Sequence, residues 1–170
     1  MAQPCFAMEV PGLARPTLGN FFFFCLSQKD VNPDTPDTKH GQTPLLWAVQ
    51  ADHEGTVKLL LERKDVNLNT PDTVHGRTPL SWAAGSGHEG IVKLLLGRED
   101  VNPETPDTVD GQTPLSWAAQ KGHEGTVNLL LERKDVNPDI LDTIYGQTPL
   151  AWAAEKGVTI PVSPGNTCSR

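Results

Sequence analysis

The stretch Gly-Arg-Thr-Pro-Leu at residues 76–80 decides the fold, because near-copies stand at residues 41–45, 111–115 and 146–150, a constant step of 35 residues. A regular period of this size is the signature of a stacked array, in which each unit buries its apolar face against its neighbours. Such arrays usually present extended surfaces to other macromolecules. The repeat therefore favours a binding function over a closed catalytic chamber.

One unit, residues 72–106, shows the elements that we expect in each copy. Thr78 can cap a helix with its hydroxyl group, and Pro79 suits the first helical position, where no N–H is needed. Gly87 suits the left-handed conformation that ends a helix. Apolar residues at helical spacing then predict a second short helix, and the proline-rich segment 100–107 predicts an extended connection. The unit is helix, turn, helix and long loop.

A tryptophan recurs at the same position of every unit: Trp47, Trp82, Trp117 and Trp152. An aromatic ladder of this kind could be a stacking platform for bases or ligands. The Leu and Ala residues beside each Trp repeat in step with it, however, and this favours packing between layers. Helices this short do not hold alone in water, so we expect stacking to supply the stability.

The charge, the cysteines and the apolar segments of the chain indicate which partners and which compartment to expect. The 170-residue chain has 14 basic and 21 acidic residues, a formal charge of −7, which disfavours nucleic acids and anionic membranes as partners. Its three cysteines lie outside the repeats without metal-ligand or redox spacing, and such thiols suit a reducing compartment. The apolar segment Phe21–Leu26 is too short for a signal peptide core or a membrane span. We therefore expect a soluble, intracellular protein, in either cytoplasm or nucleus.

The units resemble the ankyrin repeat in the order of their landmarks: Thr-Pro-Leu-Ser-Trp-Ala-Ala, Gly-His-Glu, Val-Lys-Leu-Leu-Leu and Asp-Val-Asn. The resemblance implies an all-α solenoid of paired antiparallel short helices with extended, hairpin-like connecting loops. It covers residues 29–156, with complete units at 37–71, 72–106 and 107–141 and a half unit at 142–156. The 35-residue step and the near-duplicate copies also resemble the tandem arrays that end large fungal NTPases and other multidomain fungal proteins.

Two departures from the family pattern concern stability. The usual His after Thr-Pro-Leu is Ser81 and Ser116 in two units and an apolar residue in the others, so the hydrogen bond of that His to the Thr is unavailable. The usual Gly near the end of the second helix is missing, and arginines such as Arg98 and Arg133 stand in that neighbourhood. A cation in the last turn, such as Arg98, complements the dipole of its own helix.

The two ends do not follow the repeat. Residues 1–28 read as an irregular leader, in which 21–28 matches the second helix of a degenerate repeat, and residues 157–170 read as an irregular tail. Neither end has the polar capping repeat that solenoids need for solubility. We therefore expect a fragment of a longer array or a truncated gene product, with marginal stability.

Candidates for partner binding are the positions that differ between units, in the loop before each Gly and after the first helix. In the ankyrin architecture these are the loop tips and the exposed inner-helix positions of the concave partner-binding face. A constant scaffold with variable tips suits a modular binding surface, although exposed positions also drift where nothing affects stability. The candidates are Lys39, His40, Gln50, Val74, His75, Gly85, Ser86, Val109, Asp110, Gln120, Lys121, Ile144 and Tyr145.

Residues that could suggest catalysis have simpler roles. His53-Glu54, His88-Glu89 and their equivalents lack a second His at helical spacing, so the zinc-protease pattern fails, and their recurrence indicates a turn and helix start. Ser81 shares a unit with His88, but no acidic orienting residue or oxyanion loop is identifiable. Thr-Pro pairs in the loops could accept phosphate, although turn residues need no such role. We expect no enzyme, metal or cofactor.

The resemblance implies a non-enzymatic scaffold that binds a protein partner through the loop tips and the concave inner-helix face. We expect no nucleic acid, membrane or small-molecule partner. Two alternatives stay open at this point. The array could be the sensor or regulatory arm of a larger NTPase or signalling protein, or a truncated fragment without independent function.

Overall fold

The computed structural model describes residues 32–37 and 40–160. Residues 40–160 contain seven helices and no strand. The helices are α2 (Pro44–Gln50), α3 (Glu54–Glu62), α4 (Pro79–Ser86), α5 (Glu89–Leu96), α6 (Pro114–Lys121), α7 (Glu124–Leu131) and α8 (Pro149–Lys156). The expected leader, with its degenerate helix at 21–28, lies outside the described residues, as does the expected tail from residue 161 onward.

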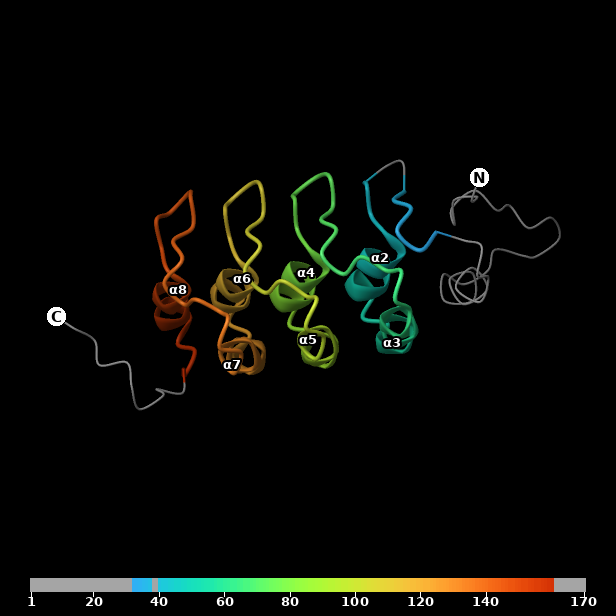
Figure 1. Ribbon diagram of the computed structural model, residues 1–170. Coiled ribbons are helices and arrows are strands. Elements are labelled where there is room, and N and C mark those ends of the chain that lie inside the picture. The colour runs from blue at the N-terminus through green and yellow to red at the C-terminus, as the bar shows by residue number, and fades with distance from the viewer. Residues whose placement is uncertain (1–31, 38–39, 161–170) are drawn as a thin grey trace.

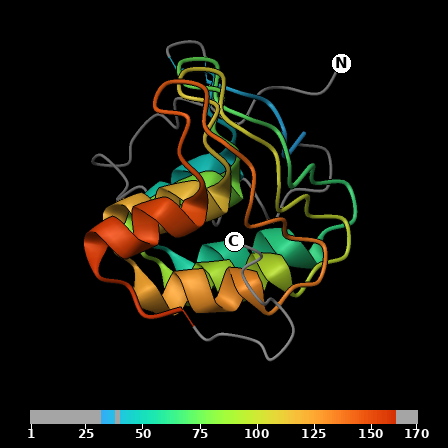
Figure 2. The same ribbon diagram turned by 90° about the vertical axis from the view of Figure 1, so that its left-hand side faces the viewer.

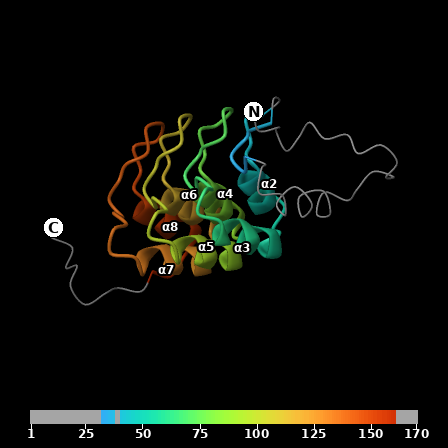
Figure 3. The same cartoon turned by 45° about the vertical axis from the view of Figure 1, so that its right-hand side comes forward.

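The helices form two rows, with a long loop rising beside each helix of the first row (Figure 1). The first row is α2, α4, α6 and α8, and the second row is α3, α5 and α7. Helix α4 packs between α2 and α6, α6 also packs on α8, and α5 packs between α3 and α7. Viewed along the array, the helices of one row lie behind one another and the loops stand together (Figure 2), and Figure 3 shows the same order obliquely. The prediction of an all-α repeat solenoid is confirmed.

The first-row helices begin and end as the sequence predicts. Thr78 Oγ1 accepts a hydrogen bond from the N–H of Ser81 at 3.2 Å, and Pro79 is the first helical residue. Gly87 ends α4 in the left-handed conformation, with φ at 73°. Asp52 holds this conformation after α2, with φ at 55°, where the later units have Gly. Because these contacts join residues close in sequence, each unit specifies them by itself.

In two units a serine hydroxyl lies beside the capping Thr, at the position where the family usually has His. Ser81 Oγ lies 3.1 Å from Thr78 Oγ1, and Ser116 Oγ lies 3.1 Å from Thr113 Oγ1. Both pairs are buried. A serine side chain is therefore long enough to reach the capping Thr from this position. The cap therefore keeps a second hydrogen bond.

The arginines that follow the second-row helices donate hydrogen bonds to carbonyl oxygens of the preceding unit. Arg98 Nη1 donates to the carbonyl oxygen of Leu61 at 2.5 Å, in the last turn of α3. Arg133 Nη1 donates to the carbonyl oxygens of Leu96 at 3.1 Å and of Arg98 at 3.3 Å, at the end of α5. Arg98 thus complements the neighbouring helix, contrary to the expectation that it complements its own. It follows the end of α5, where the stack brings the carbonyl end of α3 within reach.

The core lies between successive layers of the array. Leu60, Leu95 and Leu130 of the second row are fully buried, and Ala83 and Ala84 of the first row are fully buried too. Small side chains such as these alanines let neighbouring helices approach closely, so the short helices shield one another from water. No helix in the described part of the chain is long and apolar enough to cross a membrane.

Candidate functional site

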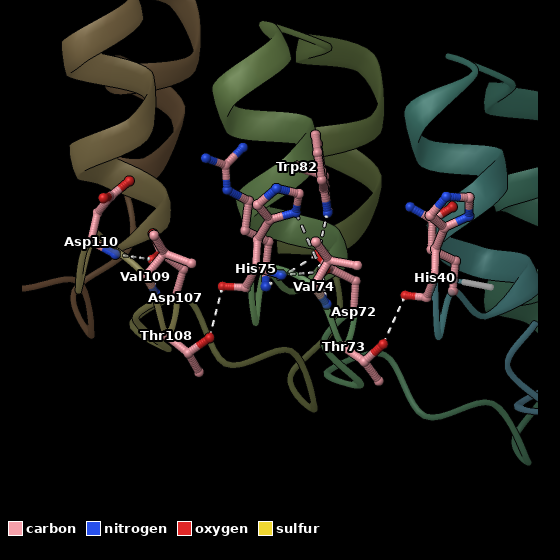
Figure 4. Close-up of polar contacts among 12 residues, drawn as sticks. His40, Asp72, Thr73, Val74, His75, Trp82, Asp107, Thr108, Val109 and Asp110 are labelled. Carbon is pink, nitrogen blue, oxygen red and sulfur yellow. Dashed lines mark hydrogen bonds and ion pairs between the residues drawn. The ribbon is translucent and has the colours of Figure 1, made fainter. Parts of the chain in front are cut away.

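Each loop tip is built around an aspartate at its base, and this aspartate is buried in the last three tips. Asp72 Oδ1 accepts hydrogen bonds from the N–H groups of Val74 at 2.9 Å and His75 at 2.6 Å. Asp72 Oδ2 accepts from the indole N–H of Trp82 at 2.8 Å (Figure 4). Burial alone would raise the pKa of Asp72, but these hydrogen bonds hold that pKa below its ordinary value. One ionised side chain therefore shapes the tip and ties it to helix α4.

The same indole bond recurs in the other units. Its length is 3.2 Å for Asp37–Trp47, 2.7 Å for Asp107–Trp117 and 2.9 Å for Asp142–Trp152. The sequence analysis missed this role of the aspartates. In the sequence, an Asp stands ten residues before every Trp. This spacing predicts no contact by itself, because the two residues meet only when the base of the loop folds over the helix. Trp117 and Trp152 are buried and Trp82 packs against the hydrophobic core, as the packing prediction requires, and all four tryptophans also anchor the tips.

Neighbouring tips are bonded to one another. Thr73 Oγ1 donates to the carbonyl oxygen of His40 at 3.0 Å, and Thr108 Oγ1 donates to that of His75 at 3.0 Å (Figure 4). Gly76, with φ at +70°, makes room for this contact, because a Cβ added there would lie 2.5 Å from Thr108 Cγ2. The tips are therefore held as a continuous band along the array.

Three aliphatic side chains project from equivalent positions of this band. Val74 is 52% exposed, Val109 is 51% exposed and Ile144 is 58% exposed. We call these three residues the tip row. All three are among the sequence candidates, and the structure places them at the same position in three consecutive tips. They form the most exposed aliphatic series that recurs between units.

The residue after each member of the tip row lies near the tryptophan layer. His75 meets Trp82 edge-on, with the ring centroids 5.8 Å apart, and Tyr145 meets Trp152 in the same way at 5.4 Å. Asp110 takes this position in the third tip. His75 is half-buried and Tyr145 is exposed, and each contacts the tryptophan of its own first-row helix.

Arg77 lies between two tryptophan layers and was missed by the sequence analysis. Its Cζ is 3.5 Å from the centroid of the Trp117 ring and 4.9 Å from that of Trp82. Burial lowers the pKa of Arg77, and the nearby carboxylates of Asp107, Asp110 and Asp72 act in the opposite direction. The other units have Gln at this position, so Arg77 is a difference between units that could have been noticed.

The remaining candidates differ in exposure. Ser86 and Lys121 are exposed at the ends of α4 and α6, and Lys121 Nζ lies 5.7 Å from the Trp117 ring centroid. Gly85 is half-buried, and a Cβ added to it would lie 3.5 Å from Trp117 Cβ. Gln50 and Gln120 are half-buried, as is His40, and Lys39 lies outside the described residues.

The His-Glu pairs pack between units at the starts of the second-row helices. A Cβ added to Gly90 would lie 1.8 Å from Glu54 Oε1, so the Glu54 carboxylate occupies the space beside that glycine. Glu89 has the same relation to Gly125. Within residues 32–37 and 40–160, no three His, Cys, Asp or Glu side chains gather in a way that could hold a metal ion.

The comparison with protein families agrees with this architecture. The family described as ankyrin repeats (3 copies) matches residues 17–107 and 99–160 of the chain. The two ranges together span most of its length. A search of curated proteins finds no match. Ankyrin repeats are generally protein-interaction modules and are typically non-enzymatic.

Proposed function

Since the chain belongs to the ankyrin repeat family, we propose that it binds a protein partner through the tip row and the adjoining surface of the first-row helices. The observation that carries the proposal is the tip row itself. Val74, Val109 and Ile144 are each more than half exposed, yet they stand on turns fixed by hydrogen bonds. Isolated exposed aliphatic residues are common, but a series at one position of successive rigid tips suits recognition.

The energetics of such a surface are favourable. Complete burial of an exposed Val or Ile side chain contributes roughly 1.5–3 kcal/mol, and these residues keep about half of their surface to bury. The tips are already ordered by the Asp72-type carboxylates and the Thr73-type bonds between units. Binding of a partner therefore costs little conformational entropy in these loops. Lys121 and Ser86 supply polar groups at the edge of the same surface, as interface rims usually do.

A pull-down comparison tests this function. The triple variant Val74→Thr, Val109→Thr and Ile144→Thr keeps β-branched side chains but removes apolar surface from the tip row. Proteins retained by the unchanged chain should be lost from this variant. Leu59→Gln is the matched control, because Leu59 is 38% exposed and lies on α3 in the second row. Equal recovery by the triple variant would contradict binding through the tip row.

A further inference from the structure

We propose that Arg77 binds a carboxylate of the partner, so that the bound segment is acidic where it crosses between α4 and α6. This inference rests on the proposed function and names the chemistry recognised on the same face. The ligand group is either an Asp or Glu side chain or a free C-terminal carboxylate. Both present the same two oxygens to a guanidinium group.

The first support is the unsatisfied state of Arg77. Its Nε is buried and has no hydrogen-bond partner among the described residues. The nearest carboxylates act on its pKa through space, but in the described part of the chain none forms an ion pair with it. Two of them are committed elsewhere, since Asp72 and Asp107 accept from their own indoles and tips. The guanidinium thus has no carboxylate or carbonyl acceptor among the described residues, and an acceptor supplied by a partner at its Nη groups would stabilise it.

The second support is its position over an aromatic ring. The guanidinium lies over the Trp117 ring at 3.5 Å and within 4.9 Å of the Trp82 centroid. A guanidinium that stacks on an aromatic ring contacts the ring through its planar face. The N–H groups at its edges then stay available for bidentate hydrogen bonds to a carboxylate. Lys121 places a second, exposed cation near the same Trp117 ring. The site is thus preorganised for an anion.

The third support is that two differences between units coincide here. Only the second described unit has Arg at this position, and the same unit has Gly85 where the others carry Gln or Glu. Gly85 lies against Trp117, since a Cβ added to it would be 3.5 Å from Trp117 Cβ. Arg77 and Gly85 both contact Trp117 from α4 or the turn before it, so one unit of the array provides them together.

The nearby carboxylates of Asp107, Asp110 and Asp72 oppose an acidic ligand, and of these only Asp110 accepts no hydrogen bond from an indole. The Asp110 carboxylate raises the pKa of Arg77, against the larger effect of burial, and so lies close enough to compete for the guanidinium. The other tips have His or Tyr at this position. If Arg77 receives a partner carboxylate, Asp110→Asn should strengthen binding of acidic ligands, because it removes the competing charge.

A display experiment tests the inference with random peptides as the probe. Peptides are selected in parallel on the full chain and on Arg77→Gln, which introduces the residue found at this position in the other units. We expect Asp and Glu, or a free C-terminus, to be enriched on the unchanged chain. We expect that enrichment to be lost on Arg77→Gln while aliphatic residues remain enriched on both.

Affinities of one selected peptide then identify the contact. Arg77→Gln should weaken binding roughly 10- to 100-fold, as for loss of a hydrogen bond to a charged group. The same peptide with Glu→Gln, or with an amidated C-terminus, should show which carboxylate is bound, and combining that change with Arg77→Gln should cost little more. Lys58→Gln, which removes an exposed cation from α3, is the charge-matched control and should leave the affinity unchanged.

The outcomes separate the two proposals. Equal affinity of Arg77→Gln, or peptides without acidic enrichment, would overturn the carboxylate site. If such peptides still lose binding to the tip-row triple variant, the proposed function stands without the further inference. Failure of any peptide to be enriched would count against both proposals.

Discussion

The carboxylate of Asp72 accepts hydrogen bonds from four N–H groups, those of Val74, His75 and Arg77 in the backbone and that of the Trp82 indole. Although burial opposes ionisation, these bonds hold the pKa of Asp72 below its ordinary value. A carboxyl group with a lowered pKa in the folded state stabilises the protein fully above its unfolded pKa of about 4. That stability is lost as the pH falls through the folded value.

Asp72→Asn tests this role at the residue scale. The Asn oxygen can still accept from the backbone, but an amide N–H then faces the Trp82 indole N–H, so one buried donor loses its partner. We expect the free energy of unfolding at pH 7 to fall by about 1–3 kcal/mol. Below about pH 4 the difference should shrink, because Asp72 becomes protonated in the unchanged chain too.

Urea denaturation at pH 7 and at pH 3 measures both effects. Asp100→Asn is the control, because Arg98 holds the pKa of that exposed carboxyl low without tying it to a tip. A constant difference between the Asp72→Asn variant and the unchanged chain at both pH values would contradict the role of ionisation.

At the scale of the helices, the second-row ends depend on a side chain of the next unit. Arg133 reaches the carbonyl oxygens of Leu96 and Arg98, which helix geometry leaves without partners. Arg133 also pairs with the exposed Asp135, and that bond raises the pKa of Arg133. The two contacts predict different consequences of mutation, because only the first one joins two units.

Arg133→Gln should lower the free energy of unfolding by about 1 kcal/mol, through loss of charged hydrogen bonds to the end of α5. Asp135→Asn should have a much smaller effect, because exposed ion pairs contribute little. Amide hydrogen exchange should show faster exchange in the last turn of α5 for Arg133→Gln. Similar destabilisation by the two variants would show that the ion pair, and not the helix end, carries the stability.

At the scale of the whole molecule, equivalent residues differ according to their place in the stack. Leu115 of α6 and Leu150 of α8 occupy the same position of the repeat. Leu115 is 2% exposed because α4 and α8 pack on both sides of α6, whereas Leu150 is 37% exposed. Stability in such an array is close to a sum of units and contacts between neighbours.

Leu115→Ala should therefore cost about 2–5 kcal/mol, as for a fully buried leucine, and Leu150→Ala should cost clearly less. Urea denaturation of the two variants checks this, since both make the same chemical change at one position of the repeat. Equal losses would mean that the face of α8 that carries Leu150 is covered in solution.

Features within one unit could be predicted from the sequence because they depend on near neighbours in the chain. The Thr78 cap, Pro79 at the helix start and the left-handed Gly87 each follow from a few consecutive residues. The tip residues Val74 and Val109 could be nominated because aligned copies show which positions vary. These inferences need only the 35-residue period and local backbone chemistry.

The sequence by itself determined the repeat, the helical units and the loop tips, because each arises from residues close together in the chain. Only the tertiary structure decided which residues meet between units: Arg77 with Trp117, Arg98 with Leu61, and Thr108 with His75. These partners lie more than 30 residues apart in the chain. Their contacts depend on the offset of one layer over the next, which arises only when the whole stack packs.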